Sequence, residues 1–121
     1  MIHRMWWACG WLGVFITLVI SLMPPPFKEG VEHGDKIAHL AGYAVLMFWW
    51  AQLIVQRRWR LAMAVVLFGI VIEWLQGFTP NRQTDALDVL ANSSGMLLGW
   101  LVARLSPNLP QRLSILFASC R

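Results

Sequence analysis

Four apolar stretches, each close to the length of a membrane-crossing helix, constrain this 121-residue sequence more than any other feature. They predict helices at about residues 5–23, 36–55, 61–79 and 86–103. A helix of roughly 20 apolar residues crosses the hydrocarbon core of a bilayer, whereas an isolated strand cannot satisfy its backbone there. The sequence therefore predicts an all-α membrane protein, a bundle of four transmembrane helices forming a single domain over residues 1–121.

The composition supports the bilayer as the solvent of this chain. Hydrophobic residues make up 58% and charged residues 13%, against roughly 45–50% and 25% in soluble domains. The net charge of +4 comes from short basic runs beside apolar stretches, which favours contact with anionic membrane lipid and excludes a nucleic-acid-binding face. Cys9 and Cys120 form neither a zinc motif nor a disulfide framework, and no cofactor is expected.

Residues that break helices separate the four stretches and mark off a tail. The prolines from Pro24 to Pro26 end the first stretch, which is too long for a signal-peptide core and is expected to stay as a helix. Pro107 and Pro110 separate the fourth stretch from the end of the chain. We expect the tail, residues 104–121, to be amphipathic and to lie on the membrane surface.

The distribution of basic residues predicts the orientation in the membrane. Cytoplasmic loops are enriched in Lys and Arg, so the side with more basic residues faces the cytoplasm. A four-pass layout places seven basic residues on one side, Arg4, Arg57, Arg58, Arg60, Arg104, Arg112 and Arg121, and Lys28, Lys36 and Arg82 on the other. Both termini are therefore predicted to be cytoplasmic.

Polar residues recur at helical spacing near the predicted outer ends of three helices. Every Asp and Glu falls on that half of the layout, which orientation rules do not require. Spacings of three and four residues place most of the polar residues on one face of each helix. They are Asp35, Lys36, His39 and Tyr43 on the second stretch, Glu73 and Gln76 on the third, Asp85, Asp88 and Asn92 on the fourth, and Arg82 in the loop between.

A charge at the bilayer centre costs about 2.5–3.5 kcal/mol on insertion scales, so we expect these groups to meet around an outward-facing pocket. We predict His39, Glu73 and Asp88 as catalytic residues, because histidine exchanges protons near neutral pH and Glu73 lies deep in its helix. The expected partners of Glu73 are His39, Lys36 and Arg82. With one histidine among these positions and no HExxH spacing, no metal site is predicted. The predicted ligand-binding residues are Asp35, Lys36, Tyr43, Gln76, Arg82 and Asn92.

Two other interpretations apply to some of these positions. Interhelical polar contacts in membranes serve packing, and Asp35 and Asp85 suit helix caps. Small residues at Gly95 and Gly99, and at Ala38 and Gly42, permit close helix approach, either within the bundle or between copies of the chain.

The ordered polar positions resemble the VanZ-like family of bacterial membrane proteins. The pattern reads Asp35-Lys36-x-x-His39-x-x-x-Tyr43, then Glu73-x-x-Gln76, then Arg82-x5-Asp88-x3-Asn92-x-x-Gly95-x3-Gly99, and it covers roughly residues 35–103. The resemblance implies a multi-pass protein of the bacterial cell envelope, in the cytoplasmic (inner) membrane. The family is named after a member linked to teicoplanin resistance, and the resemblance implies no settled reaction.

Two functions follow as hypotheses. In the first, the pocket binds or processes an anionic lipid or a lipid-linked envelope precursor, or affects susceptibility to teicoplanin-type glycopeptides. Lys36 and Arg82 would hold a phosphate, while His39 with Glu73 or Asp88 would handle a proton. In the second, the protein is a non-enzymatic membrane scaffold whose polar groups only fix helix packing, with association between copies through Gly95 and Gly99.

Overall fold

The computed structural model describes residues 1–24, 34–80 and 84–119. Within them it contains four long helices, α1 (Ile2–Leu22), α2 (Gly34–Leu53), α3 (Arg58–Gln76) and α4 (Ala86–Leu105), and a shorter helix, α5 (Leu109–Ser119). The predicted all-α bundle of four long helices is confirmed. The helix bounds differ from the predicted ones by a few residues, as in α3, which was expected at residues 61–79.

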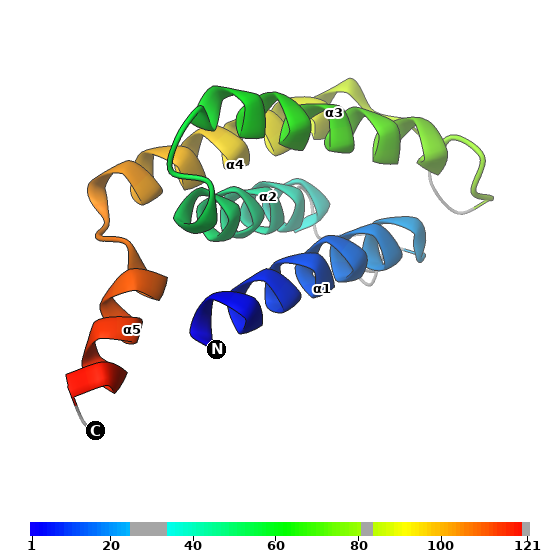
Figure 1. Ribbon diagram of the computed structural model, residues 1–121. Helices are drawn as coiled ribbons and strands as arrows, with labels where there is room; N and C mark the ends of the chain where they lie inside the picture. Colours follow the sequence, from blue (N-terminus) through cyan, green and yellow to red (C-terminus); the bar gives the residue numbers. More distant parts are fainter. Residues whose placement is uncertain (25–33, 81–83, 120–121) are drawn as a thin grey trace.

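Successive long helices run in opposite directions, so both termini lie at the same end of the bundle (Figure 1). The starts of α2 and α4 and the end of α3 lie together at the opposite end. Helix α2 is central, and its most extensive contact is with α4. This arrangement is compatible with two cytoplasmic termini, which stay a prediction because the side of the membrane is not defined.

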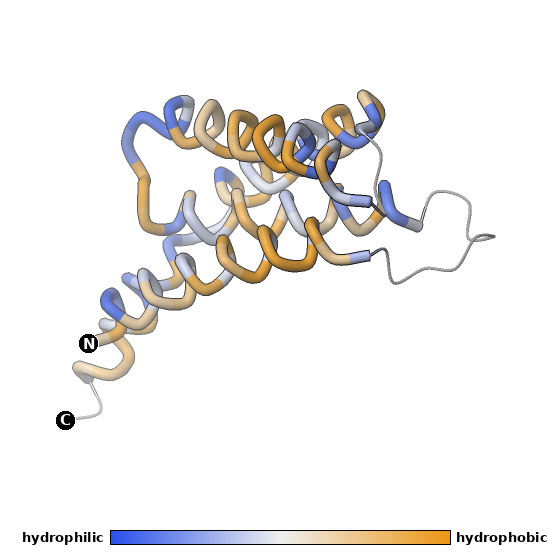
Figure 2. Tube along the Cα trace, turned by 90° about the vertical axis from the view of Figure 1, so that its right-hand side faces the viewer, coloured by the Kyte–Doolittle hydropathy of each residue, from blue (hydrophilic) through white to orange (hydrophobic). Residues whose placement is uncertain are grey.

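Three parts of the described chain have the length and apolar composition of a membrane span, namely α1, α3 and the stretch Ala86–Ser119 that contains α4. Large apolar side chains on these helices point outward, including Phe15, Leu67, Leu90 and Leu101. In Figure 2, much of the length of the helices is coloured orange, which marks hydrophobic residues. A soluble protein does not expose apolar surface on this scale, and the chain is therefore a multi-pass membrane protein.

Helix α2 is not one of the three span-like parts, and it has the fewest exposed residues of the four long helices. His39, Tyr43 and Gln52 are all buried in it. Polar side chains inside a membrane bundle face protein rather than lipid because lipid offers them no partner. The central position of α2 thus explains how a helix with these buried polar residues can lie within the bundle.

Two glycines bring α4 against the backbone of α2. A Cβ atom on Gly95 would collide with the carbonyl oxygen of Leu40, and one on Gly99 would collide with that of Ala44. Here the small residues serve packing within the chain. Association between copies stays a prediction and would use another face.

The predicted small-residue pair on α2 does not have this role. Ala38 is exposed, and a Cβ atom on Gly42 would meet nothing within 4 Å. The expected close approach at these two positions is therefore absent within the described chain, and a close approach between copies there stays a prediction. The side of α2 that meets α4 closely is the one carrying Leu40 and Ala44.

Aromatic and amide contacts hold the end that carries the termini. The indoles of Trp6 and Trp49 stack with centroids 4.1 Å apart, and Trp49 Nε1 donates to the Trp6 carbonyl at 2.9 Å. The side chain of Gln52 accepts from the backbone N–H of Leu109 at 2.9 Å, which fastens the start of α5 to α2. The predicted tail is thus a helix anchored to the bundle, and its position on the membrane surface stays a prediction.

Candidate functional site

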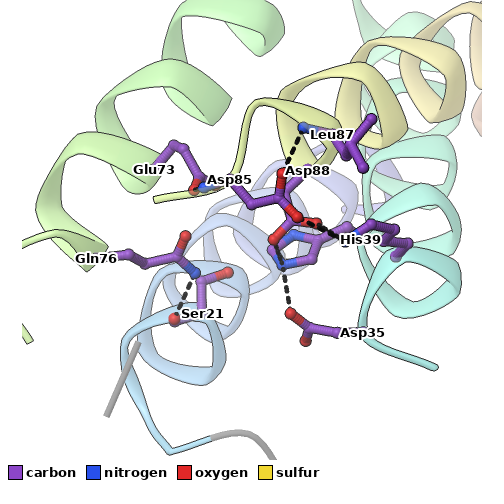
Figure 3. A network of polar contacts seen from close by, with 9 residues as sticks. Ser21, Asp35, His39, Glu73, Gln76, Asp85, Leu87 and Asp88 are labelled. Atoms are coloured by element: carbon purple, nitrogen blue, oxygen red, sulfur yellow. Dashed lines mark hydrogen bonds and ion pairs between the residues drawn. The ribbon is translucent and has the colours of Figure 1, made fainter. Parts of the chain in front are cut away.

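Six polar side chains gather where α2 begins, α3 ends and α4 begins (Figure 3). We call them the polar cluster: Asp35, Lys36, His39, Glu73, Asp85 and Asp88. Three of them, each from a different helix, are almost fully buried: His39 is 7% exposed, Glu73 6% and Asp88 5%. The expectation that these costly groups face one another rather than lipid agrees with this geometry, while their catalytic roles stay predictions.

Lys36 joins the start of α2 to the start of α4. Its Nζ atom lies 2.7 Å from Oδ2 of Asp85 and 3.3 Å from Oδ1 of Asp88. Hydrogen bonds from Lys36 and from the backbone N–H of Leu87 hold the pKa of Asp85 below its ordinary value. The positive charge that was expected to bind a phosphate is thus shared between two carboxylates.

His39 lies between two carboxylates without a hydrogen bond to either. Its Nε2 atom is 3.6 Å from Oδ2 of Asp35 and 3.7 Å from Oδ2 of Asp88 (Figure 3). Protein hydrogen bonds from nitrogen to oxygen usually measure 2.7–3.2 Å. The three side chains therefore face a common point while remaining slightly apart.

Glu73 binds a backbone group and neither of the two expected partners that the structure describes, Lys36 and His39. Its Oε1 atom accepts a hydrogen bond from the backbone N–H of Asp85 at 2.6 Å. Lys36 pairs with the aspartates instead, and His39 Nε2 faces Asp35 and Asp88. Its second oxygen, Oε2, is buried and has no hydrogen-bond partner in the described chain.

The polar face continues inward from the cluster through Tyr43 and Asn92. Both are buried, and a Cβ atom on Gly69 of α3 would lie 3.2 Å from Asn92 Nδ2 and 3.3 Å from Tyr43 Oη. The polar atoms of these two side chains have no hydrogen-bond partner among the described residues. Buried polar atoms are normally satisfied, so these two side chains are candidates for contact with a further polar group.

Gln76 lies on the α1 side of α3. Its Nε2 atom donates to the carbonyl oxygen of Ser21 at 2.8 Å, joining the ends of α3 and α1 (Figure 3). This contact serves helix packing, and a role in ligand binding stays a prediction. Arg82, the remaining predicted site residue, lies outside the described residues.

A family model described as VanZ/LLP1 matches residues 2–107 of the chain. The chain belongs to the VanZ/LLP1 family. No match is found among curated proteins or among solved structures.

The VanZ/LLP1 match reaches further than the resemblance seen in the polar motif, which covered roughly residues 35–103. It includes all of α1, in which the Ser21 carbonyl oxygen accepts the hydrogen bond from Gln76. It ends before α5 begins. The family therefore describes the four long helices, and α5 lies beyond the matched region.

The sequence did not single out Asp85 as a site residue, although it caps α4. Its Oδ1 atom accepts from the N–H of Leu87 at 2.9 Å, so the predicted cap is present. The other oxygen binds Lys36 and the backbone N–H binds Glu73, which makes Asp85 a link between α2, α3 and α4. Its spacing of three residues from Asp88 was the only available signal of this second role.

One group of side chains in this VanZ/LLP1 protein has the composition of a metal site. Asp35, His39 and Asp88 each offer one ligand atom, and these atoms lie within 4.8 Å of one another. The spacing of residues along one helix did not predict this group, because its members come from two helices. Imidazole and carboxylate are common ligands of divalent cations.

Proposed function

We propose that the polar cluster is the functional site of this VanZ/LLP1 protein and that it binds the headgroup of an anionic lipid or of a lipid-linked precursor of the bacterial envelope. The observation that supports this most is the burial of His39, Glu73 and Asp88 on three different helices at one end of the bundle. Ionisable residues inside a membrane domain favour function over packing because polar contacts there contribute only about 0.6 kcal/mol each on average.

The lateral surface of the bundle offers a place for an acyl chain. An apolar groove between α1 and α2 is lined by residues that include Gly13, Thr17, Ala41 and Gly42. Gly42 lies three residues from His39 on α2, which places the two on neighbouring parts of the helix surface, so the groove begins about one turn from the cluster. A membrane lipid is the natural occupant of such a groove, because it lies at the depth of the hydrocarbon core.

The proposal is tested by substitutions in the cluster. We propose that the wild-type chain changes the teicoplanin susceptibility of a sensitive bacterial host, and we expect His39→Ala and Glu73→Gln to abolish that change. Membrane abundance is measured in parallel, with His3→Ala as the matched control because His3 is exposed and lies at the other end of the bundle. Full function of both cluster variants at normal abundance would contradict the proposal.

Lipid binding is measured directly on the purified chain. Native mass spectrometry with phosphatidylglycerol and with a polyprenyl phosphate compares the wild type with His39→Ala. Loss of bound lipid from His39→Ala, with retention by the wild type, supports the headgroup site. Of the two lipids, the one that the wild type retains better indicates the chemical class of the ligand. Equal retention of both lipids by wild type and variant contradicts it.

The alternative is a scaffold in which the polar groups only fix packing. The contact between Gln76 and Ser21 favours it, because that hydrogen bond joins two helix ends and nothing else. A scaffold predicts that cluster substitutions lower abundance and function together. Gly95→Leu does not separate the two functions, because the larger side chain would disrupt packing against Leu40 within one chain.

A further inference from the structure

We infer that Asp35, His39 and Asp88 bind a divalent cation at the polar end of the bundle. Cation binding itself does not depend on the proposed lipid headgroup. The argument begins with the ligand atoms, which lie within 4.8 Å of one another and come from the first two turns of α2 and the first turn of α4.

The distances fit a shared cation better than a pair of hydrogen bonds. Zinc binds imidazole nitrogen and carboxylate oxygen at about 2.0–2.2 Å in tetrahedral geometry, which places neighbouring ligand atoms roughly 3.3–3.6 Å apart. His39 Nε2 is 3.6 Å from the Asp35 oxygen and 3.7 Å from the Asp88 oxygen. A charge-assisted hydrogen bond would draw each pair to about 2.7–2.9 Å.

Glu73 supplies a second and independent reason. Its side chain is 6% exposed, and its Oε2 atom has no hydrogen-bond partner among the described residues. The other oxygen fixes the carboxyl group to the N–H of Asp85, the residue whose side chain meets Lys36 (Figure 3). This carboxyl group is not among the three side-chain groups that offer ligand atoms within 4.8 Å of one another, so its role would be to orient a water molecule bound to the cation.

The balance of charge points the same way. Two carboxyl groups of the cluster, those of Glu73 and Asp88, are almost fully buried, and Lys36 contacts the second of them. Buried charge is costly unless it is paired. A divalent cation would add positive charge beside these two groups without moving Lys36 from its aspartates.

The ligand set indicates which cations to test. One imidazole and two carboxylates suit Zn²⁺ or Mn²⁺, whereas Mg²⁺ prefers oxygen ligands and retains most of its water. Three protein ligands leave at least one coordination position open. On the proposed function, that position would accept a phosphate oxygen of the headgroup, which explains how an acidic cluster could bind an anion.

The test uses the full untagged chain in detergent, stripped of metal and titrated with Zn²⁺ by calorimetry, with bound metal counted by elemental analysis. We expect one Zn²⁺ per chain and at least a tenfold weaker affinity in His39→Ala and Asp88→Asn. His3→Ala is expected to bind as the wild type does. Asp35→Asn serves as the second ligand variant, because the Asp35 side chain is 38% exposed and its replacement leaves the buried core intact.

Three outcomes separate this inference from the lipid proposal. Wild-type protein that binds no Zn²⁺ or Mn²⁺, or Asp35→Asn and His39→Ala proteins that bind as well as the wild type, overturn the cation site. Loss of lipid in His39→Ala alongside such a result leaves the headgroup proposal standing. Zn²⁺ binding that depends on the three ligands, with lipid retention unaffected by a chelator, supports the cation site and removes its link to the headgroup.

Discussion

The ammonium nitrogen of Lys36 lies 2.7 Å from Oδ2 of Asp85, and this ion pair joins the first turn of α2 to the residue that caps α4. Asp88 lies one turn further into α4, 3.3 Å from the same nitrogen. The Asp85 side chain is 40% exposed, whereas the Asp88 side chain is 7% exposed. Loss of the Lys36 ammonium group therefore affects the two aspartates differently.

Replacing Lys36 by Met leaves the buried Asp88 carboxylate without its cation. We expect the free energy of unfolding to fall by about 1–3 kcal/mol, the usual cost of an unsatisfied buried group. The measurement is thermal unfolding of the purified protein in detergent. Arg112→Gln is the control, because Arg112 is exposed on α5 and such changes usually stay within about 0.5 kcal/mol. A Lys36→Met protein as stable as this control would show that the pair contributes nothing to the bundle.

The same pair predicts a dependence on pH. The hydrogen bond from Lys36, followed by that from the Leu87 N–H, holds the pKa of Asp85 below its ordinary value of 3.8. The folded state therefore binds this proton less readily than the unfolded state. The stabilisation is complete above the unfolded pKa and is lost as the pH falls through the lower folded pKa.

The experiment compares the wild type with Asp85→Asn, which keeps a capping side chain. We expect their difference in melting temperature to be constant from about pH 8 to about pH 5 and to shrink below about pH 4. A difference that persists unchanged to about pH 3 would show that Asp85 is not stabilised in its ionised form.

The sequence predicts which residues turn inward because the cost of a charge in lipid acts on each residue separately. His39, Glu73 and Asp88 lie on the inner faces that helical spacing gave them. The partners could not be predicted, because spacing along one helix does not determine which atoms of a neighbouring helix lie opposite. Among the described residues, Glu73 was expected to meet Lys36 or His39 and instead accepts a backbone N–H from Asp85.

The role of each small residue is also a property of the assembled bundle. Gly95 and Gly99 contact α2 closely, whereas Gly42, with similar spacing from Ala38, borders a groove. Both pairs have the same pattern in the sequence, and only the relative rotation of α1, α2 and α4 separates them. The three helices with span-like composition could be recognised from hydropathy alone, because lipid contacts them directly.

Two substitutions of Glu73 distinguish a role in packing from a role in function. Glu73→Gln keeps an oxygen that can accept from the Asp85 N–H, so we expect near-normal membrane abundance with loss of the susceptibility phenotype. Glu73→Leu removes the acceptor and leaves that N–H unpaired, which is expected to destabilise the protein by about 1–3 kcal/mol. Immunoblots of membrane fractions and thermal unfolding distinguish the two. Glu73→Gln protein with full function would assign this side chain to packing.

Gly95→Ala tests the close contact between α2 and α4, and Gly13→Ala is the control that makes the same chemical change elsewhere. A Cβ atom at position 95 would collide with the Leu40 carbonyl oxygen, so α4 must move away from α2 at a cost of about 1–3 kcal/mol. A Cβ atom at position 13 of α1 would meet nothing within 4 Å, and alanine there should stabilise the helix by about 0.5–1 kcal/mol. Thermal unfolding in one detergent is expected to shift the two melting temperatures in opposite directions. Equal shifts would mean that the bundle does not hold α4 against α2 at Gly95.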